Sequence, residues 1–181
     1  IDSFTGKYNP GTACWRPPTF ADGRSVDEVY PEKEWPFIAV SYKPRYRTGA
    51  YLDNVPLLKS LQDTNYIEMN IEDAEALGVS TGDRVKLITP TGEVEGTVKV
   101  RRGVGKGSIG IEYGYGHWGN SGSKGFEIDG QKYGGGPRDG KGILLNHLAL
   151  RDISLQTPHP LCDLVGGSTD RNTVKAKIVK L

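Results

Sequence analysis

The sequence predicts a mainly β fold, a barrel of short strands with short helices at its periphery. The chain has 25 glycines and 11 prolines among 181 residues, and such a density of turn-forming residues suits short strands better than a helix bundle. Several short runs alternate apolar and polar residues, which is the period of a half-buried strand. At this length one domain with a substantial core is expected.

The stretch 70–106 carries the clearest local pattern. Asn70 is placed to cap a short helix: its side chain would accept from the Asp73 amide while the Asp73 carboxylate reaches back, as in a capping box. Gly78 marks the helix end, because a residue without Cβ adopts the left-handed conformation at little cost. Two alternating runs then predict a β-hairpin around a Pro-Thr-Gly turn, with strands at 84–89 and 93–100.

The other strands are expected from apolar content or alternation. The run 35–42 is apolar at most positions, which indicates a strand buried on both faces. Residues 66–70 lead into the helix capped by Asn70, and 108–113 place Ile109, Ile111 and Tyr113 on one face. The last strand is expected at 173–179.

The remaining elements are short. A helix is expected at 53–61, with Leu57, Leu58 and Leu61 on one face. Val26, Val29 and Tyr30 could form one helical turn, and residues 126–133 predict a small hairpin with Asp-Gly at its tip. The glycine-rich residues 134–142 read as a loop.

Residues 1–34 show little periodicity and are expected to form an arm that lies on the barrel and links it to a preceding domain. The sequence begins at Ile1 without a methionine, so we expect a piece of a longer protein. The barrel domain itself is expected to span 35–181.

Composition and motifs exclude several function classes. A net charge of +1 gives no electrostatic basis for binding nucleic acid, and no apolar run is long enough to insert into a membrane. Elbow-type Ser/His/Asp spacing, a His-Glu-x-x-His motif and cysteine clusters for iron–sulfur or zinc are all missing. Cys14 and Cys162 are either two separate thiols or a disulfide that ties the arm to the barrel.

The string Asn-x-x-Asp-Ala-x-x-Leu-Gly-Val-x-x-Gly-Asp-x-Val, which begins at Asn70 and is followed by a Thr-Pro-x-Gly hairpin, resembles the C-terminal cofactor-binding domain of molybdopterin oxidoreductases. The resemblance covers residues 35–181. It implies a six-stranded double-psi β-barrel that lies over a bis(molybdopterin guanine dinucleotide) cofactor. The chain would bind and orient the cofactor, while molybdenum, held by earlier domains, performs the chemistry.

The same resemblance implies partners and a reaction. The Tyr-Gly-His-Trp run at 115–118 is similar to sulfur-oxyanion reductases of the family, so the whole enzyme is expected to reduce a sulfur oxyanion such as tetrathionate. Expected partners are upstream domains of the same polypeptide and an iron–sulfur electron-transfer subunit, on the periplasmic side of the membrane. The domain alone is expected to be inactive and empty.

Four segments supply the predicted cofactor-binding residues. The loop after strand 35–42 combines cations, which bind phosphate, with tyrosines and a hydroxyl. Residues 115–118 place rings between glycines, where a backbone can approach a ligand. Asn146 offers both amide donors and an acceptor, as pterin and guanine edges require, and His147 and Asp152 in the same segment are further candidates. The full set is Tyr42, Lys43, Tyr46, Arg47, Thr48, Tyr115, Gly116, His117, Trp118, Asn146, Arg171 and Asn172; no catalytic or metal-ligating residue is expected.

Other interpretations of these residues stay open. The 43–49 loop could be a solvated connection, His117 a surface group, and Asn146 a cap or turn residue. The barrel could instead serve as an adaptor or substrate-recognition module of an AAA ATPase. It could also be a self-processing decarboxylase that cleaves at Gly-Ser, since such pairs occur at 107–108, 122–123 and 167–168.

Overall fold

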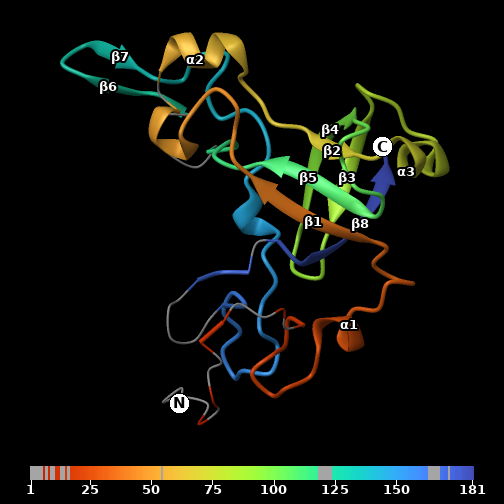
Figure 1. Cartoon of the computed structure of the whole chain (residues 1–181). Helices are drawn as coiled ribbons and strands as arrows, with labels where there is room; N and C mark the ends of the chain where they lie inside the picture. Colours follow the sequence, from red (N-terminus) through yellow and green to blue (C-terminus); the bar gives the residue numbers. More distant parts are fainter. Residues whose placement is uncertain are drawn as a thin grey trace.

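A computed structural model describes residues 6, 8, 11–12, 15, 17–53, 55–117, 124–162, 168–170 and 172–181. Within these residues six strands close into a barrel in the order β1-β5-β2-β4-β3-β8 (Figure 1). The strands are β1 Phe37–Tyr42, β2 Ile67–Met69, β3 Arg84–Ile88, β4 Glu93–Val100, β5 Ser108–Glu112 and β8 Val174–Lys180. The predicted six-stranded barrel is therefore confirmed.

The peripheral elements are all short, as expected. Three α-helices are described, α1 Val26–Val29, α2 Pro56–Leu61 and α3 Ile71–Leu77, together with the 3-10 turns η1 Gly49–Leu52 and η2 Leu145–His147. A separate hairpin of β6 Phe126–Ile128 and β7 Gln131–Tyr133 projects beside α2 (Figure 1). Asp129 and Gly130 at its tip both have positive φ, which is the conformation of a type I′ hairpin turn.

Two of the strand pairings are parallel, β1 with β5 and β2 with β4, and the other four are antiparallel. Because β1 and β5 run side by side in the same direction, the chain leaves both at the same end of the barrel. The amide of Tyr113 donates to the carbonyl of Tyr42 at 3.0 Å, so the pairing continues past the last strand residues. The loops that follow β1 and β5 therefore begin next to each other.

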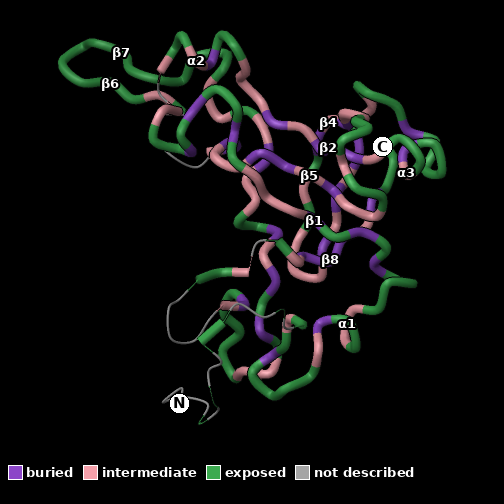
Figure 2. The backbone as a smooth tube through the Cα atoms, in the orientation of Figure 1, coloured by how far each residue is buried: buried purple, intermediate pink, exposed green. Residues whose placement is uncertain are grey.

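The core consists of the alternating apolar residues of these strands. Ile67, Val85, Leu87, Val98 and Ile109 have no exposed surface. Buried backbone follows the barrel strands in Figure 2, and exposed backbone follows the hairpin and the loops. Full burial of such a side chain contributes about 1.5–3 kcal/mol, so period-2 alternation is the main source of the barrel's stability.

Three local predictions need correction. The Asn70 side chain accepts from the Glu72 amide (2.9 Å), not from Asp73. The Asp73 carboxylate accepts instead from the amide of Gly107 (2.7 Å) and so ties α3 to the loop before β5. Strand β1 is not buried on both faces, because Ile38 is exposed.

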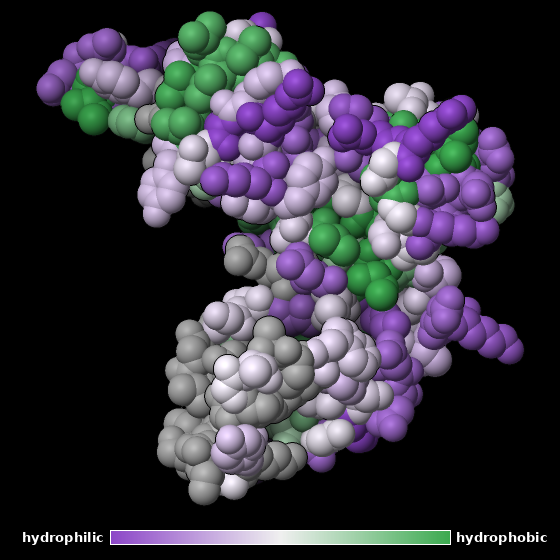
Figure 3. Space-filling view, in the orientation of Figure 1, coloured by the Kyte–Doolittle hydropathy of each residue, from purple (hydrophilic) through white to green (hydrophobic). Residues whose placement is uncertain are grey.

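The third correction concerns α2. Leu57 and Leu61 face solvent, and the helix buries Lys59, which pairs with Asp139 in the 134–142 loop. Hydrophobic side chains accordingly gather on the surface over α2 in Figure 3. Leucine spacing predicted the helix correctly, but tertiary contacts leave Leu57 and Leu61 exposed and Leu58 half-buried.

Residues 17–34 pack against the barrel domain. Phe20 and Val26 belong to the same buried cluster as the strand residues. The Asp152 carboxylate, 3% exposed, accepts from the Ala21 amide (2.8 Å) and from the amide and hydroxyl of Ser154 (3.0 and 2.5 Å). Asp152, a further candidate for the cofactor site, thus anchors the segment that precedes β1.

The acid dependence of stability tests this anchor. Burial acts to raise the pKa of Asp152, but the hydrogen bonds from Ser154 and Ala21 outweigh it and lower the pKa. A lowered folded-state pKa means that the contribution is present above the unfolded value of about 3.9 and is lost as the pH falls through the folded value. Asp152→Asn should cost about 2 kcal/mol at pH 7 and less at pH 3, measured by urea unfolding. Asp129→Asn on the exposed hairpin is the control, and a cost independent of pH would contradict the assignment.

Candidate functional site

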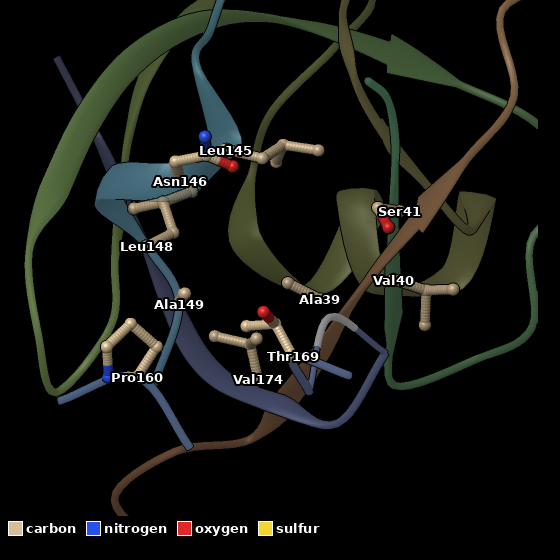
Figure 4. A pocket seen from close by; sticks show the side chains of 10 residues that line it. All are labelled: Ala39, Val40, Ser41, Leu145, Asn146, Leu148, Ala149, Pro160, Thr169 and Val174. Atoms are coloured by element: carbon tan, nitrogen blue, oxygen red, sulfur yellow. The ribbon is translucent and has the colours of Figure 1, made fainter. Parts of the chain in front are cut away.

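A pocket of about 320 Å³ lies at one end of the barrel, between β1, β8 and η2. In Figure 4, Asn146 and Ser41 lie on opposite sides of this pocket, with Ala39 and Val174 at its lower side. Most of its wall is apolar, and its polar side chains are the neutral Ser41, Asn146 and Thr169. The lining residues are Ala39, Val40, Ser41, Leu145, Asn146, Leu148, Ala149, Pro160, Thr169 and Val174.

The turn that carries Asn146 is fixed by close backbone packing. A Cβ on Gly116 would lie 2.5 Å from the Leu144 nitrogen, and a Cβ on Gly92 would lie 2.5 Å from the His147 carbonyl oxygen. Gly116 also has φ +74°, a conformation that side chains other than glycine rarely adopt. Glycine at both positions lets the backbones on either side of η2 approach it. The predicted residue Gly116 therefore shapes the pocket wall.

Asn65 holds the same turn from the other side. It is 2% exposed, donates Nδ2 to the carbonyls of Glu112 (2.7 Å) and Ile143 (3.0 Å), and accepts from the Ile143 amide (2.7 Å). Sequence reasoning missed Asn65, since a single asparagine before a strand carries no signal of its partners. Its three bonds join the end of β5 to the segment that leads into η2.

Asn172 lies beside the pocket. Its Oδ1 accepts from the amide and the hydroxyl of Ser41, both at 3.3 Å. Asp170 accepts from the amides of Asn172 and Thr173, each at 3.2 Å, and fixes the turn before β8. Ser41 lines the pocket, so two of the predicted binding residues, Asn146 and Asn172, border the same cavity.

A second group forms where the loops after β1 and β5 meet. The Arg47 side chain is 2% exposed, and its guanidinium carbon lies 3.7 Å from the centroid of the Tyr115 ring. Its Nη1 donates to Asp53 at 2.5 Å, while its buried Nε and Nη2 have no hydrogen-bond partner. Burial raises the pKa of the Tyr115 phenol, and the Arg47 charge only partly offsets this. The phenol thus stays protonated beside the cation.

The two groups are connected through the chain. Gly116, next to Tyr115, donates its amide to the Lys141 carbonyl (2.9 Å) and touches Ile143 and Leu144. Leu145 and Asn146 follow directly. A buried guanidinium and a neutral pocket are thus linked by a few residues of tightly packed backbone.

The other predicted residues are distributed more widely. Tyr42 is on the face of β1 opposite Ala39 and Ser41 and lines a different pocket, of about 350 Å³, with Glu68, Arg101 and Gly110. Tyr46 borders a polar cleft with Lys59. Lys43, Thr48 and His147 are exposed, and His117 is half-buried close to Tyr115 in the chain. Trp118 and Arg171 lie outside the described residues.

Other site types find little support in the described part of the chain. The described residues contain no group of three His, Cys, Asp or Glu that could hold a metal ion. Among them no helix is long and apolar enough to cross a membrane. Cys162 is a free, half-buried thiol, and Cys14 lies outside the described residues.

Residues 37–137 match the family model described as Molydopterin dinucleotide binding domain. This chain belongs to that family. A tetrathionate reductase subunit from Salmonella typhimurium is 32% identical over 179 residues, 99% of this chain and 17% of the relative. The corresponding tetrathionate reductase subunit from Archaeoglobus fulgidus is 35% identical over 136 residues, 68% of this chain and 12% of the relative.

A solved structure shares the fold. Acetylene hydratase from Pelobacter acetylenicus superposes with a TM-score of 0.60 at 15% identity, over 93% of this chain and 21% of that one. The family model and the two relatives confirm the family membership predicted from the sequence. The chain is a molybdopterin-binding domain with tetrathionate reductase homologues. It spans less than a fifth of the length of those relatives.

Removal of the Asn65 side chain should loosen the pocket wall. Asn65→Ala leaves buried amide and carbonyl groups of Ile143 and Glu112 without partners, and we expect a loss of about 3 kcal/mol in unfolding free energy. Amide hydrogen exchange at residues 143–147 should accelerate at least tenfold. Gln131→Ala on the exposed hairpin is the control. Unchanged exchange at 143–147 would show that Asn65 does not hold η2.

Proposed function

We propose that this molybdopterin-binding domain orients bis(molybdopterin guanine dinucleotide) with molybdenum in a tetrathionate reductase-like enzyme. Support comes from the family membership, from the two tetrathionate reductase relatives, and from the chemistry of the residues at the barrel end. The carrying observation is the buried guanidinium of Arg47, with its Nε and Nη2 unpartnered.

An unpartnered buried donor costs about 1–3 kcal/mol, and more on a charged group. Nε and Nη2 form one edge of the guanidinium, and this edge matches two oxygens of a phosphate through parallel hydrogen bonds. Asp53 and the Tyr115 ring hold the guanidinium in place before any ligand arrives. A shift of the surrounding loop residues would open this buried edge, and Arg47 would then hold an anionic group of the cofactor with little loss of its own side-chain freedom.

The neutral pocket suits a different part of the same ligand. Its apolar walls can cover the faces of a heterocycle, and the amide of Asn146 can both donate to and accept from a ring edge. Asn172 fixes the hydroxyl of Ser41 on the other side. When bound, the cofactor supplies the two-electron chemistry; the residues of this chain bind it, orient it and exclude water around it.

The partners follow as part of this proposal. Upstream domains of the same polypeptide would complete the cofactor envelope, and an iron–sulfur subunit would deliver electrons. The 181-residue chain alone would then be inactive and empty. The periplasmic side of the membrane stays a prediction for the whole enzyme.

Loss of either site residue should lower cofactor content. Arg47→Ala or Asn146→Ala in the whole enzyme should reduce the molybdenum content several-fold, measured by mass spectrometry of the metal, because each removes hydrogen bonds to the cofactor. Arg102→Ala, an exposed arginine in the loop after β4, is the matched control. Unchanged molybdenum in both site variants would contradict the assignment.

Stability of the 181-residue chain separates ligand binding from a structural role for Arg47. Replacement of a buried ion pair by apolar or neutral groups is often neutral or stabilising. Arg47→Met/Asp53→Asn should therefore leave the unfolding free energy of the chain within about 1 kcal/mol of the wild type, or raise it. A loss of more than about 3 kcal/mol would mean that the guanidinium serves the fold.

A further inference from the structure

Helix α2 presents its apolar side to solvent. Leu57 and Leu61 are one helical turn apart and are 70% and 57% exposed, and Tyr51 in the preceding η1 is 90% exposed. The residue that faces the protein is Lys59, whose ammonium pairs with Asp139. A surface helix ordinarily buries its apolar stripe, so this arrangement indicates a second surface that covers the leucines.

The β6–β7 hairpin also exposes its apolar side chains to solvent. Phe126 lies opposite Tyr133 in the register, their rings stack with centroids 5.4 Å apart, and Ile128 shares their face because it is two residues from Phe126. All three are exposed, by 43%, 41% and 54%. Glu127 and Lys132 occupy the other face. A two-stranded ribbon exposed on both faces is marginal in water by itself, so its apolar face is a candidate contact surface.

The two surfaces belong to one region of the molecule. Hairpin and helix lie together at the end of the molecule away from α1 (Figure 1), and hydrophobic side chains are visible on both in Figure 3. Lys59 pairs with Asp139 and Lys141 with Asp63, so the loop after the hairpin is tied to α2 on both sides. The region also adjoins the candidate site, since Tyr51 follows Arg47 by four residues.

We propose that this apolar face, formed by Tyr51, Leu57, Leu61, Phe126, Ile128 and Tyr133, docks the remaining part of a molybdopterin catalytic subunit. The inference rests on the proposed function. The chain spans only 17% and 12% of its tetrathionate reductase relatives, so more than four fifths of such a polypeptide lies outside it. A body of that size can cover a helix face and a hairpin at once, and contiguous apolar faces are characteristic of permanent contacts of this kind.

The apolar face lies close to Arg47 in the chain, which connects docking with cofactor binding. Thr48 and η1 follow Arg47 directly in the chain, so the body seated on α2 would also lie close to the Arg47 side chain, whose buried Nε and Nη2 have no hydrogen-bond partner. Docking would then cover the hairpin and close the cofactor envelope in one step. The domain supplies one wall, and the body held by the apolar face supplies the opposite wall.

Hydroxyl-radical footprinting of the 181-residue chain and of the purified catalytic subunit tests the proposal. Oxidation of Leu57, Leu61 and Ile128 should be at least fivefold slower in the subunit than in the chain, while Ile153, exposed elsewhere, should react equally in both. Equal rates at the face in a subunit that contains molybdenum would overturn the docking surface and leave the proposed function standing. A subunit without molybdenum would overturn the proposed function, and this inference with it.

Two further measurements complete the test. Slow oxidation of the face in the chain alone, with a dimer in sedimentation velocity, would identify a second copy as the occupant and overturn the proposal. In the subunit, Leu57→Gln/Leu61→Gln/Ile128→Thr should lower molybdenum content at least threefold, while the melting temperature of the 181-residue chain with the same changes stays constant. Ile153→Thr is the matched control, and normal molybdenum content in the triple variant would also overturn the proposal.

Discussion

The parallel pairing of β1 with β5 is the constraint on which the site depends. Parallel neighbours release their following loops at the same end of a sheet, and the hydrogen bond from Tyr113 to Tyr42 keeps the two chains together as they leave. Arg47 and Tyr115 are 68 positions apart in sequence, yet this geometry stacks them. An antiparallel pairing would send the two loops to opposite ends, and neither the buried guanidinium nor its link to the pocket would form.

The backbone that forms the pocket wall is held in place by Asn65 and by two closely packed glycines. Asn65 joins β5 to the segment before η2 with three hydrogen bonds, and Gly92 and Gly116 let neighbouring backbones close on that turn. The Asn146 amide therefore projects from a rigid frame. Rigidity of this kind lowers the entropy lost on binding, which suits the cofactor-orienting role proposed for this domain.

Two features of the domain are unfavourable in free energy when the domain is isolated, and both concern the same region of the molecule. Arg47 keeps two buried donors unpartnered, and the surfaces of η1, α2 and the hairpin expose six large apolar side chains. Each is unfavourable in an isolated domain, by desolvation in the first case and by contact with water in the second. Both are satisfied if an anionic cofactor and a second protein body meet this region, as proposed for the whole enzyme.

The sequence alone determined the barrel, because period-2 burial, the left-handed Gly78 and the Asp-Gly hairpin are local rules that need no partner. It also determined the family, through the helix–turn–hairpin string that starts at Asn70. Only the tertiary structure decided which long-range partner each polar group finds: that Asp73 bonds to Gly107, that Lys59 rather than leucine is buried under α2, and that Asn65 holds the Asn146 turn. The physical reason is that a buried polar group bonds to whichever complementary group the closed barrel places next to it. The spacing of residues along the chain does not indicate which group that will be.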